Sequence, residues 1–275
     1  MKKRINNYFT HFILCIASIF ILVPIVWMFM TSFKYFKDIV SAKIIFKPTL
    51  FNYYNLFFED KGFLLFFKNS IIIAFFSMLL CVFIGTLGAY GLSRFKWSNC
   101  IPLILLGWVV VVQTIPGITL VIPLYSIGME MNILDTKLFM ILINTILNIP
   151  LMLWLMMSFF KQIPDEIEEA ALMDGASSWI IFVKIMLPLT KPAVIAGGLM
   201  TFIFSWKEFL MALNLTSTLN AMPLTVRIAR FIQSYNVQYG NVAAAATLGA
   251  IPAILLAVFA QRYITSGITS GAVKG

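Results

Sequence analysis

Long apolar segments alternate with short polar ones along this chain, and the pattern predicts helices that cross a membrane. Several apolar segments continue for twenty or more residues with few charges, which is enough for a helix to span the hydrocarbon core of a bilayer. We predict six spans, at about residues 9–33, 69–92, 101–122, 138–160, 192–213 and 241–261. The predicted fold class is all-α: a polytopic membrane protein with a single transmembrane domain over residues 1–275.

Polar residues that a lipid environment disfavours lie in the third and fifth of these spans, and the fourth contains Asn144 and Asn148. Gln113 and Pro116 interrupt the third span, as either a kink or part of a permeation path. The fifth holds Lys207 and Glu208 beside Trp206. Charges inside a span usually mark a pathway, but this pair could instead lie near the outer interface, neutralise each other and orient the helix. Gln113, Trp206, Lys207 and Glu208 are therefore candidate pathway residues.

One polar segment, residues 161–191, differs from its apolar surroundings. Five of the eleven acidic residues of the chain fall within positions 165–174. A short amphipathic helix can lie on the lipid surface, but such helices usually carry Lys and Arg toward anionic head groups. The acidic charge therefore favours a protein partner.

The same segment predicts a helix, a break and a second helix. Pro164 and Asp165 suit a helix start, because proline costs little there and an early carboxylate complements the helix dipole. Gly175 can adopt the left-handed conformation that ends a helix. A second apolar run begins at Trp179 and is expected to stop at Pro188.

Composition limits the function classes. The chain is 61% hydrophobic and 11% charged, which is outside the range of soluble proteins. Its net charge is +9, but the basic residues are scattered, so no nucleic-acid surface is indicated. A single histidine argues against a histidine-ligated metal centre and a Ser/His/Asp triad, and no G-x-x-x-x-G-K-[ST] motif is present. We expect no enzymatic activity and no cofactor in this chain.

The acidic segment carries a motif. Glu169-Ala170-Ala171, three residues, Gly175, nine residues and Ile185-x-Leu187-Pro188 resemble the EAA signature of permease subunits in bacterial ABC importers. The resemblance implies a type I ABC importer permease fold, in which this loop is the coupling helix that sits in a groove of a cytoplasmic ATPase. The implied coupling residues are Glu169, Ala170, Ala171, Asp174, Gly175, Ile185, Leu187 and Pro188.

Other stretches resemble one branch of that family, the second permease subunit of carbohydrate importers. The end of the chain, from Gln261-Arg262-Tyr263 to Gly275, is similar to that branch's Q-R-Y-x-x-x-G-L-T-x-G-A-V-K-G ending, with Ile268 in place of leucine. Ala89 to Phe95 resembles its A-Y-A-L-S-R-F segment, with glycine at position 91. The resemblance implies that the tail, residues 262–275, reaches the ATPase through Gly271, Ala272, Val273 and Lys274. Considered without this resemblance, the tail is a disordered, glycine-rich end with no assigned role.

The resemblance also implies the partners and the location. The expected partners are a second permease in a heterodimer, a dimer of ATPase subunits that binds ATP and Mg, an extracytoplasmic substrate-binding protein and membrane lipid, with no nucleic acid. The expected location is the cytoplasmic (inner) membrane of a bacterium, with both termini cytoplasmic. Ten basic residues lie on the side of the termini and nine on the other, so the positive-inside rule supports this orientation only marginally.

Two alternatives remain open. A self-sufficient secondary transporter or channel would need polar groups within the membrane to couple an ion gradient, and Lys207 and Glu208 are the candidates. An importer of a phosphorylated polyol such as glycerol phosphate would share much of the same pattern as a sugar importer.

Overall fold

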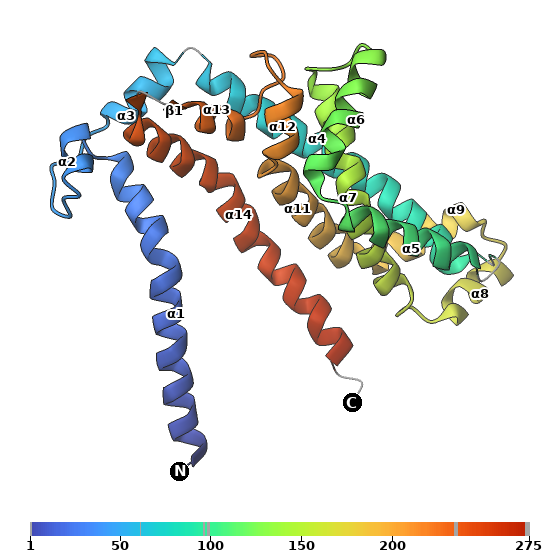
Figure 1. Ribbon diagram of the computed structural model, residues 1–275. Coiled ribbons are helices and arrows are strands. Elements are labelled where there is room, and N and C mark those ends of the chain that lie inside the picture. Colours follow the sequence, from blue (N-terminus) through green and yellow to red (C-terminus); the bar gives the residue numbers. More distant parts are fainter. Residues whose placement is uncertain (1, 61, 96, 98–99, 234–235, 273–275) are drawn as a thin grey trace. The chain divides into compact units, whose positions relative to one another are not determined.

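The computed structural model describes residues 2–60, 62–95, 97, 100–233 and 236–272. The chain divides into two compact units: Met1–Leu64 with Arg227–Ile251 (unit 1), and Leu65–Val226 with Pro252–Gly275 (unit 2). Within the described ranges the regular elements are helices, apart from one hairpin with two residues in each strand (Figure 1). This architecture confirms the all-α prediction.

Unit 1 contains the start of the chain and the segment that follows the first long helix. Its elements are α1 (Lys2–Ser32), α2 (Phe36–Val40), α3 (Phe51–Tyr54), the π-helical turn η1 (Asn55–Glu59), and the antiparallel strands β1 (Ile232–Gln233) and β2 (Asn236–Val237). Three helices continue from one unit into the other: α4 (Phe63–Arg94), α13 (Leu224–Arg230) and α14 (Tyr239–Ala272).

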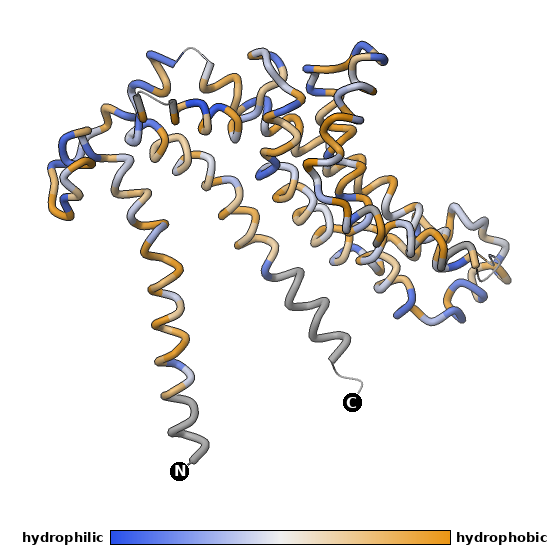
Figure 2. Tube along the Cα trace, viewed as in Figure 1, coloured by the Kyte–Doolittle hydropathy of each residue, from blue (hydrophilic) through white to orange (hydrophobic). Residues whose placement is uncertain are grey.

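Unit 2 contains the remaining helices. They are α5 (Cys100–Thr114), α6 (Gly117–Glu130), α7 (Lys137–Phe160), α8 (Asp165–Met173), α9 (Ser178–Ile181), the π-helical turn η2 (Phe182–Met186), α10 (Leu187–Leu189), α11 (Lys191–Trp206) and α12 (Leu210–Leu215). Figure 2 shows α8 as a hydrophilic segment, in contrast to the mainly hydrophobic α7.

Among the described residues, four helices are long and apolar enough to cross a membrane individually: Phe9–Ser32, Phe63–Arg94, Lys137–Phe160 and Tyr239–Gln261. The bent pair Ser178–Leu189 and Lys191–Trp206 would make a fifth span if counted as one. The predicted third span is divided, because α5 ends at Thr114 and α6 begins at Gly117. Pro116, which precedes α6, is the physical reason for the break. The count of six spans stays a prediction.

Unit 2 packs through close approaches at glycine. A Cβ on Gly85 of α4 would lie 2.6 Å from Cγ of Met152 on α7, and one on Gly197 of α11 would lie 2.9 Å from Leu155 Cδ2. The missing side chains thus let α4 and α11 approach α7 closely, as small residues do in membrane bundles. Met152 is fully buried in a cluster that also holds Ala171 of α8.

Unit 1 is fixed at the end of α1 by buried polar contacts. The side-chain amide of Asn52 donates to the carbonyl oxygens of Ser32 and Lys34, at 2.9 Å each. Lys34 is itself fully buried, and its ammonium lies 4.1 Å from the ring centroid of Trp27 and 5.0 Å from that of Phe46. These contacts hold α3 against the turn that follows α1.

A carboxylate ties together two loops of unit 2. Asp135, in the turn between α6 and α7, accepts hydrogen bonds from the backbone N–H and the hydroxyl of Ser217 and from the backbone N–H of Thr218, at 2.8 to 3.2 Å. Burial raises the pKa of Asp135, but these hydrogen bonds outweigh it, so the net pKa is lowered.

Candidate functional site

The acidic segment forms the short helix α8, which begins at Asp165 directly after Pro164. Asp165, Glu166 and Glu168 lie in its first turn, where carboxylates complement the exposed N–H groups of a helix. Ala171 is the buried residue of α8 and packs in the cluster around Met152. The helix therefore has one side against the bundle and one side free.

Gly175 ends α8 in the way its sequence predicts. Its φ is +81°, in the left-handed region that glycine enters without steric cost. The Gly175 N–H donates to the carbonyl of Leu172 and the Ala176 N–H donates to that of Ala171, both at 3.0 Å. This pair of bonds is a Schellman motif. A Cβ at Gly175 would meet nothing within 4 Å, so only the backbone conformation demands glycine here.

Arg94, at the end of α4, holds α8 in place. Its guanidinium is only 7% exposed and donates to the carbonyl oxygens of Phe160 and Ile163, at 2.6 Å each. It also pairs with Asp165 and lies 3.4 Å from Glu168 Oε2. One side chain thus joins the end of α4, the end of α7 and the first turn of α8.

The free side of α8 combines acidic and apolar side chains. Glu166, Glu169 and Asp174 are exposed, and none of them has an ion-pair partner within the part of the chain that the structure describes. Leu172 is 54% and Met173 88% exposed on the same short helix. Uncovered apolar residues beside unpaired carboxylates favour a protein partner with a basic and apolar groove.

The last three residues of the EAA-like motif lie in η2 and α10: Ile185 in η2, and Leu187 and Pro188 in α10. Ile185 and Leu187 are partly buried against the cluster around Met152, whereas Pro188 is exposed. The sequence predicts that the helix stops at Pro188. This prediction is wrong, because the helix continues to Leu189. The π-helical turn directly before it shifts the hydrogen-bonding pattern, and proline is tolerated in the first turn of the new helical segment.

After Leu189 the chain bends sharply. The segment Ser178–Leu189 and the helix Lys191–Trp206 meet at an angle of 78° around Thr190. The Thr190 hydroxyl donates to the Met186 carbonyl at 2.8 Å, and Pro192 sits in the first turn of α11, where its missing N–H costs nothing. The loop is therefore joined to α11 through a corner, but to α4 and α7 through Arg94.

The predicted pathway residues do not form one cluster with free polar groups. Gln113 is exposed near the end of α5. Trp206 is buried at the end of α11, where its ring stacks on Phe202 and meets the edge of Phe67, at centroid distances of 5.9 and 5.5 Å. Its ring is occupied by packing within this chain.

Lys207 and Glu208 take separate partners. The ammonium of Lys207 lies 4.6 Å from the Phe204 ring centroid. The Glu208 carboxylate accepts from the backbone N–H groups of Met211 and Ala212, at 2.7 and 3.0 Å, and so caps α12. Among the described residues no ion pair joins Lys207 and Glu208, and the two roles considered for them, in a pathway or at the outer interface, stay predictions.

The tail has more order in its backbone than a glycine-rich end suggests. Helix α14 continues to Ala272, so Gly271 and Ala272 are its last two residues. Val273 and Lys274 lie outside the described residues. Within those residues no group of three or more His, Cys, Asp or Glu side chains could hold a metal ion.

Reasoning from the sequence missed the role of Arg94. The signal available in the sequence is a single arginine at the end of a 32-residue apolar helix. Its acceptors come from Phe160 and Ile163, which are 66 and 69 positions away.

Comparison with known proteins decides the family. A family model described as binding-protein-dependent transport system inner membrane component matches residues 82–270, more than half of the chain. The chain belongs to this family. As an inner membrane component with several apolar helices, it is a membrane protein.

Relatives of this permease family align over nearly the whole chain. The probable ABC transporter permease protein y4oR of Sinorhizobium fredii is 36% identical over 263 residues, which cover 94% of this chain and 93% of the relative. The trehalose transport system permease protein SugB of Mycobacterium tuberculosis is 34% identical over 256 residues, with 92% and 93% covered. These relatives are permease subunits and not enzymes, which confirms the expectation that this chain is no enzyme.

A solved structure shows the same fold. The bacterial ABC transporter involved in the import of the acidic polysaccharide alginate contains a chain that superposes with a TM-score of 0.78 at 22% identity, covering 96% of this chain and 98% of that one. The match confirms the ABC importer permease fold that the EAA-like motif implied.

Proposed function

We propose that this permease is half of the translocation pathway of an ATP-driven importer for a sugar or oligosaccharide. It pairs with a second permease and receives substrate from an extracytoplasmic binding protein. A dimer of cytoplasmic ATPase subunits, which binds ATP and Mg, engages the loop of residues 164–188. Both termini are then cytoplasmic.

The free side of α8 is the observation that carries this proposal. Glu169 and Asp174 are exposed without an ion-pair partner in the described chain, next to the largely uncovered Met173. An isolated helix of nine residues is unstable in water, so its shape depends on its anchors. Arg94 and the Gly175 break supply those anchors and leave the outer side available for a partner.

Movement of α8 would reach the spans through the contacts already described. Closure of the ATPase dimer would draw the coupling helices together, and hydrolysis would reset them. Because Arg94 connects α8 with the ends of α4 and α7, a displacement of the loop acts on both helices. The bundle is the two-state element in this scheme, and ATP binding favours one of its states.

The substrate class rests on the relatives. SugB is named as a trehalose transport permease, and the similar structure belongs to an importer of a polysaccharide. Both are carbohydrates, which supports a sugar or oligosaccharide over a phosphorylated polyol.

Site-specific photo-crosslinking tests the coupling assignment. A photoreactive phenylalanine analogue placed at Met173 should capture an ATPase subunit in native membranes, because this side chain is 88% exposed on the free side of α8. The same analogue at Trp154, which is 61% exposed on the spanning helix α7, serves as the control and should capture no ATPase. If the second permease co-purifies but position 173 captures no ATPase, the coupling assignment is wrong.

A further inference from the structure

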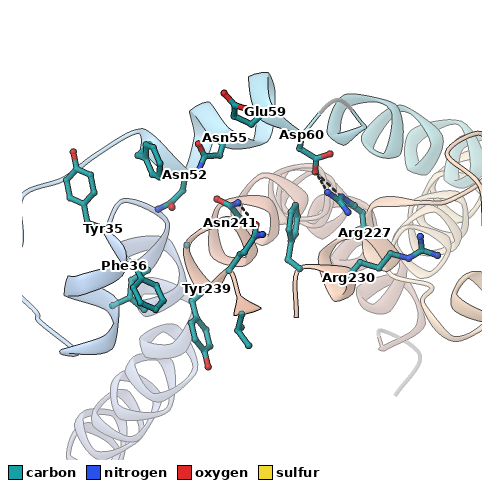
Figure 3. Close-up of a pocket in the computed structure, with 16 residues that line it drawn as sticks. Tyr35, Phe36, Asn52, Asn55, Glu59, Asp60, Arg227, Arg230, Tyr239 and Asn241 are labelled. Atoms are coloured by element: carbon teal, nitrogen blue, oxygen red, sulfur yellow. Dashed lines mark hydrogen bonds and ion pairs between the residues drawn. The ribbon is translucent and has the colours of Figure 1, made fainter. Parts of the chain in front are cut away.

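Unit 1 contains a cavity of about 640 Å³, with a lining of both polar and apolar side chains, that the coupling mechanism does not use. It lies between the segment of residues 35–60 on one side and residues 227–241 on the other (Figure 3). Its volume falls in the range of about 300–1,000 Å³ that is typical of small-molecule sites. The cavity follows the end of α1, so with a cytoplasmic N-terminus, as proposed above, it opens on the extracytoplasmic side.

Exposed aromatic rings surround the cavity. Tyr35, Phe36 and Phe51 contribute from one wall and Tyr239 from the other, and each side chain is about half exposed or more. The face of an aromatic ring is apolar and carries partial negative charge, so it attracts the weakly positive C–H face of a sugar ring. Rings placed around polar groups are suited to a ligand with both C–H faces and hydroxyls.

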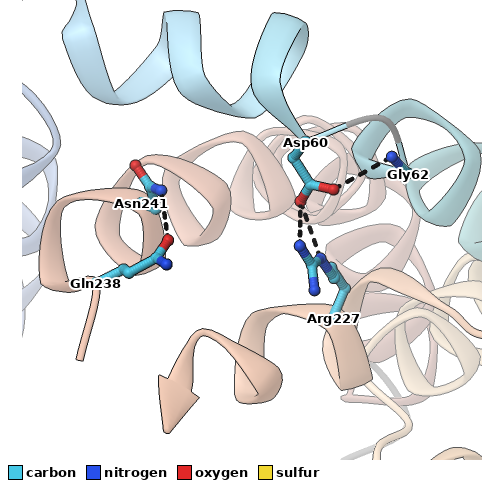
Figure 4. Close-up of polar contacts among 5 residues, drawn as sticks. All are labelled: Asp60, Gly62, Arg227, Gln238 and Asn241. Atoms are coloured by element: carbon cyan, nitrogen blue, oxygen red, sulfur yellow. Dashed lines mark hydrogen bonds and ion pairs between the residues drawn. The ribbon is translucent and has the colours of Figure 1, made fainter. Parts of the chain in front are cut away.

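Amide side chains inside the cavity have hydrogen-bonding capacity left. Asn241 Nδ2 donates to Gln238 Oε1 at 2.7 Å, which leaves Asn241 Oδ1 as an acceptor and Gln238 Nε2 as a donor (Figure 4). Asn55, from η1 on the other wall, has no side-chain hydrogen bond among the described residues. Figure 3 shows Asn55 and Asn241 coming from the two facing segments. Acceptors and donors on both walls match the mixed character of a hydroxyl group.

The charges that line the cavity balance. Asp60 accepts from Arg227 Nε and a terminal guanidinium nitrogen, at 2.9 and 2.7 Å, and its other oxygen accepts from the Gly62 N–H (Figure 4). Glu59 and Arg230 add one charge of each sign. A lining with no net formal charge suits a neutral ligand better than an anion or a cation.

The two walls of the cavity are in close contact at Gly240 and Asn52. A Cβ on Gly240 would lie 2.6 Å from Asn52 Cγ, so the start of α14 is in close contact with this side chain. Asn52 cannot move aside easily, because its amide is bound to the carbonyl oxygens of Ser32 and Lys34. A site that exists before binding loses less free energy to ordering.

We propose that this cavity binds a neutral saccharide on the extracytoplasmic side of the permease. The ligand class rests on the proposed function, because the sugar would arrive from the binding protein. None of the residues that line the cavity belongs to the coupling loop, and occupation of the cavity needs neither ATP nor that loop.

Saturation-transfer NMR on the complete importer, without nucleotide and without binding protein, tests the proposal. Maltose and trehalose serve as neutral probes and glucuronate as the anionic comparison. We expect both disaccharides to receive saturation from the protein. Asn55→Leu and Asn241→Leu should each weaken disaccharide binding by about tenfold, the effect of losing one or two hydrogen bonds. Gln238→Leu, at an exposed position, repeats the test with little risk to folding.

Asn220→Leu is the matched control, since Asn220 is an exposed asparagine outside the cavity. It should leave disaccharide binding unchanged. The proposal is overturned if the unmodified importer binds neither disaccharide, if the variants bind as well as it does, or if glucuronate binds equally tightly. Variants that lose only affinity for the binding protein would identify a docking surface instead. Failure of photo-crosslinking at Met173 would count against the coupling assignment alone, because this binding assay does not involve the ATPase.

Discussion

Gly175 is a position where the backbone, not the space around it, selects the residue. Its φ of +81° is strained for any side chain with a Cβ, although such an atom would meet no neighbour. Asparagine tolerates this conformation better than most residues. Substitutions at this position therefore separate backbone strain from simple bulk.

Gly175→Asp should abolish uptake while the chain stays inserted in the membrane. Aspartate and asparagine tolerate the left-handed conformation about equally, so the difference between the two variants comes from the further carboxylate that Gly175→Asp places beside Asp174, at the end of α8. Radiolabelled sugar uptake in cells, with membrane fractionation of the chain, measures both results. Gly175→Asn should retain much of the uptake. Normal transport by Gly175→Asp would refute the role of this break.

The contacts of Arg94 require the planar, branched shape of a guanidinium group. It binds two carbonyl oxygens and two carboxylates in different directions, which the planar guanidinium can do and a single ammonium cannot. Arg94→Lys and Arg94→Gln should therefore both separate ATP hydrolysis from transport. Each lost bond from a charged donor is worth about 1.5–3 kcal/mol, and the exposed Asp165 contributes least.

The ratio of sugar transported to ATP hydrolysed, in proteoliposomes, measures the effect of the Arg94 variants. We expect this ratio to fall about tenfold or more. Lys161→Gln changes an exposed cation in the same loop and should leave the ratio unchanged. An Arg94→Gln variant with a normal ratio would show that α8 does not need this anchor.

Among the elements, the contact of α4 with α7 depends on the absence of a side chain at Gly85. Gly85→Ala would place Cβ 2.6 Å from Met152 Cγ, and the Met152 Cβ, only 2.8 Å away, cannot give way. Such overpacking costs roughly 1–3 kcal/mol. The melting temperature of the purified complex should fall. Gly91→Ala, whose Cβ would have its nearest neighbour at 4.0 Å, should melt at the same temperature or slightly higher.

The link between the α6–α7 turn and the residues after α12 should depend on pH. The folded-state pKa of Asp135 is lower than the value of about 3.9 for an unfolded chain. Its contribution to stability is therefore complete above that unfolded value and is lost as the pH falls through the folded pKa. Asp135→Asn keeps a residue that tolerates the φ of +57°, but it removes one acceptor oxygen.

Melting curves at several pH values test this link. At pH 7 the Asp135→Asn protein should melt at a lower temperature than the unmodified protein, and the difference should shrink toward pH 3. A difference that does not change with pH would mean that the charge of Asp135 contributes nothing.

For the whole molecule, the energy source separates the proposed importer from a secondary transporter. Uptake should stop when cellular ATP is depleted and should continue when a protonophore collapses the proton gradient at constant ATP. The hydrogen bonds of the Glu208 carboxylate to the first turn of α12 support this expectation, because they engage this side chain in a structural role. Loss of uptake with the protonophore alone would favour the secondary transporter.

Features fixed by short stretches of chain were predictable from the sequence. The start of α8 at Asp165, its end at Gly175 and the break near Pro116 each depend on one or two neighbouring residues. Features that join distant residues were not predictable. The acceptors of Arg94 lie more than sixty positions away, and the capping of α12 by Glu208 requires a helix to end at Trp206 inside a continuous apolar segment.

The cavity in unit 1 is a further feature that joins distant residues and could not be predicted from the sequence. Asn55 and Asn241 are separated by more than half of the chain, and neither belongs to a recognisable motif. Polar residues in a loop between spans look solvated when each is considered alone. Only their placement on facing walls suggests a binding site.

The two ways in which the α8 loop is attached have a consequence for the motion of the bundle. Arg94 links the loop to the ends of α4 and α7, so in the proposed mechanism a displacement of α8 would shift both helix ends with it. The connection to α11 bends by 78° at Thr190, so in the same mechanism a displacement of the loop would rotate α11. In the proposed mechanism, one displacement of α8 would therefore shift two helices and turn a third, so that these helices would slide relative to one another.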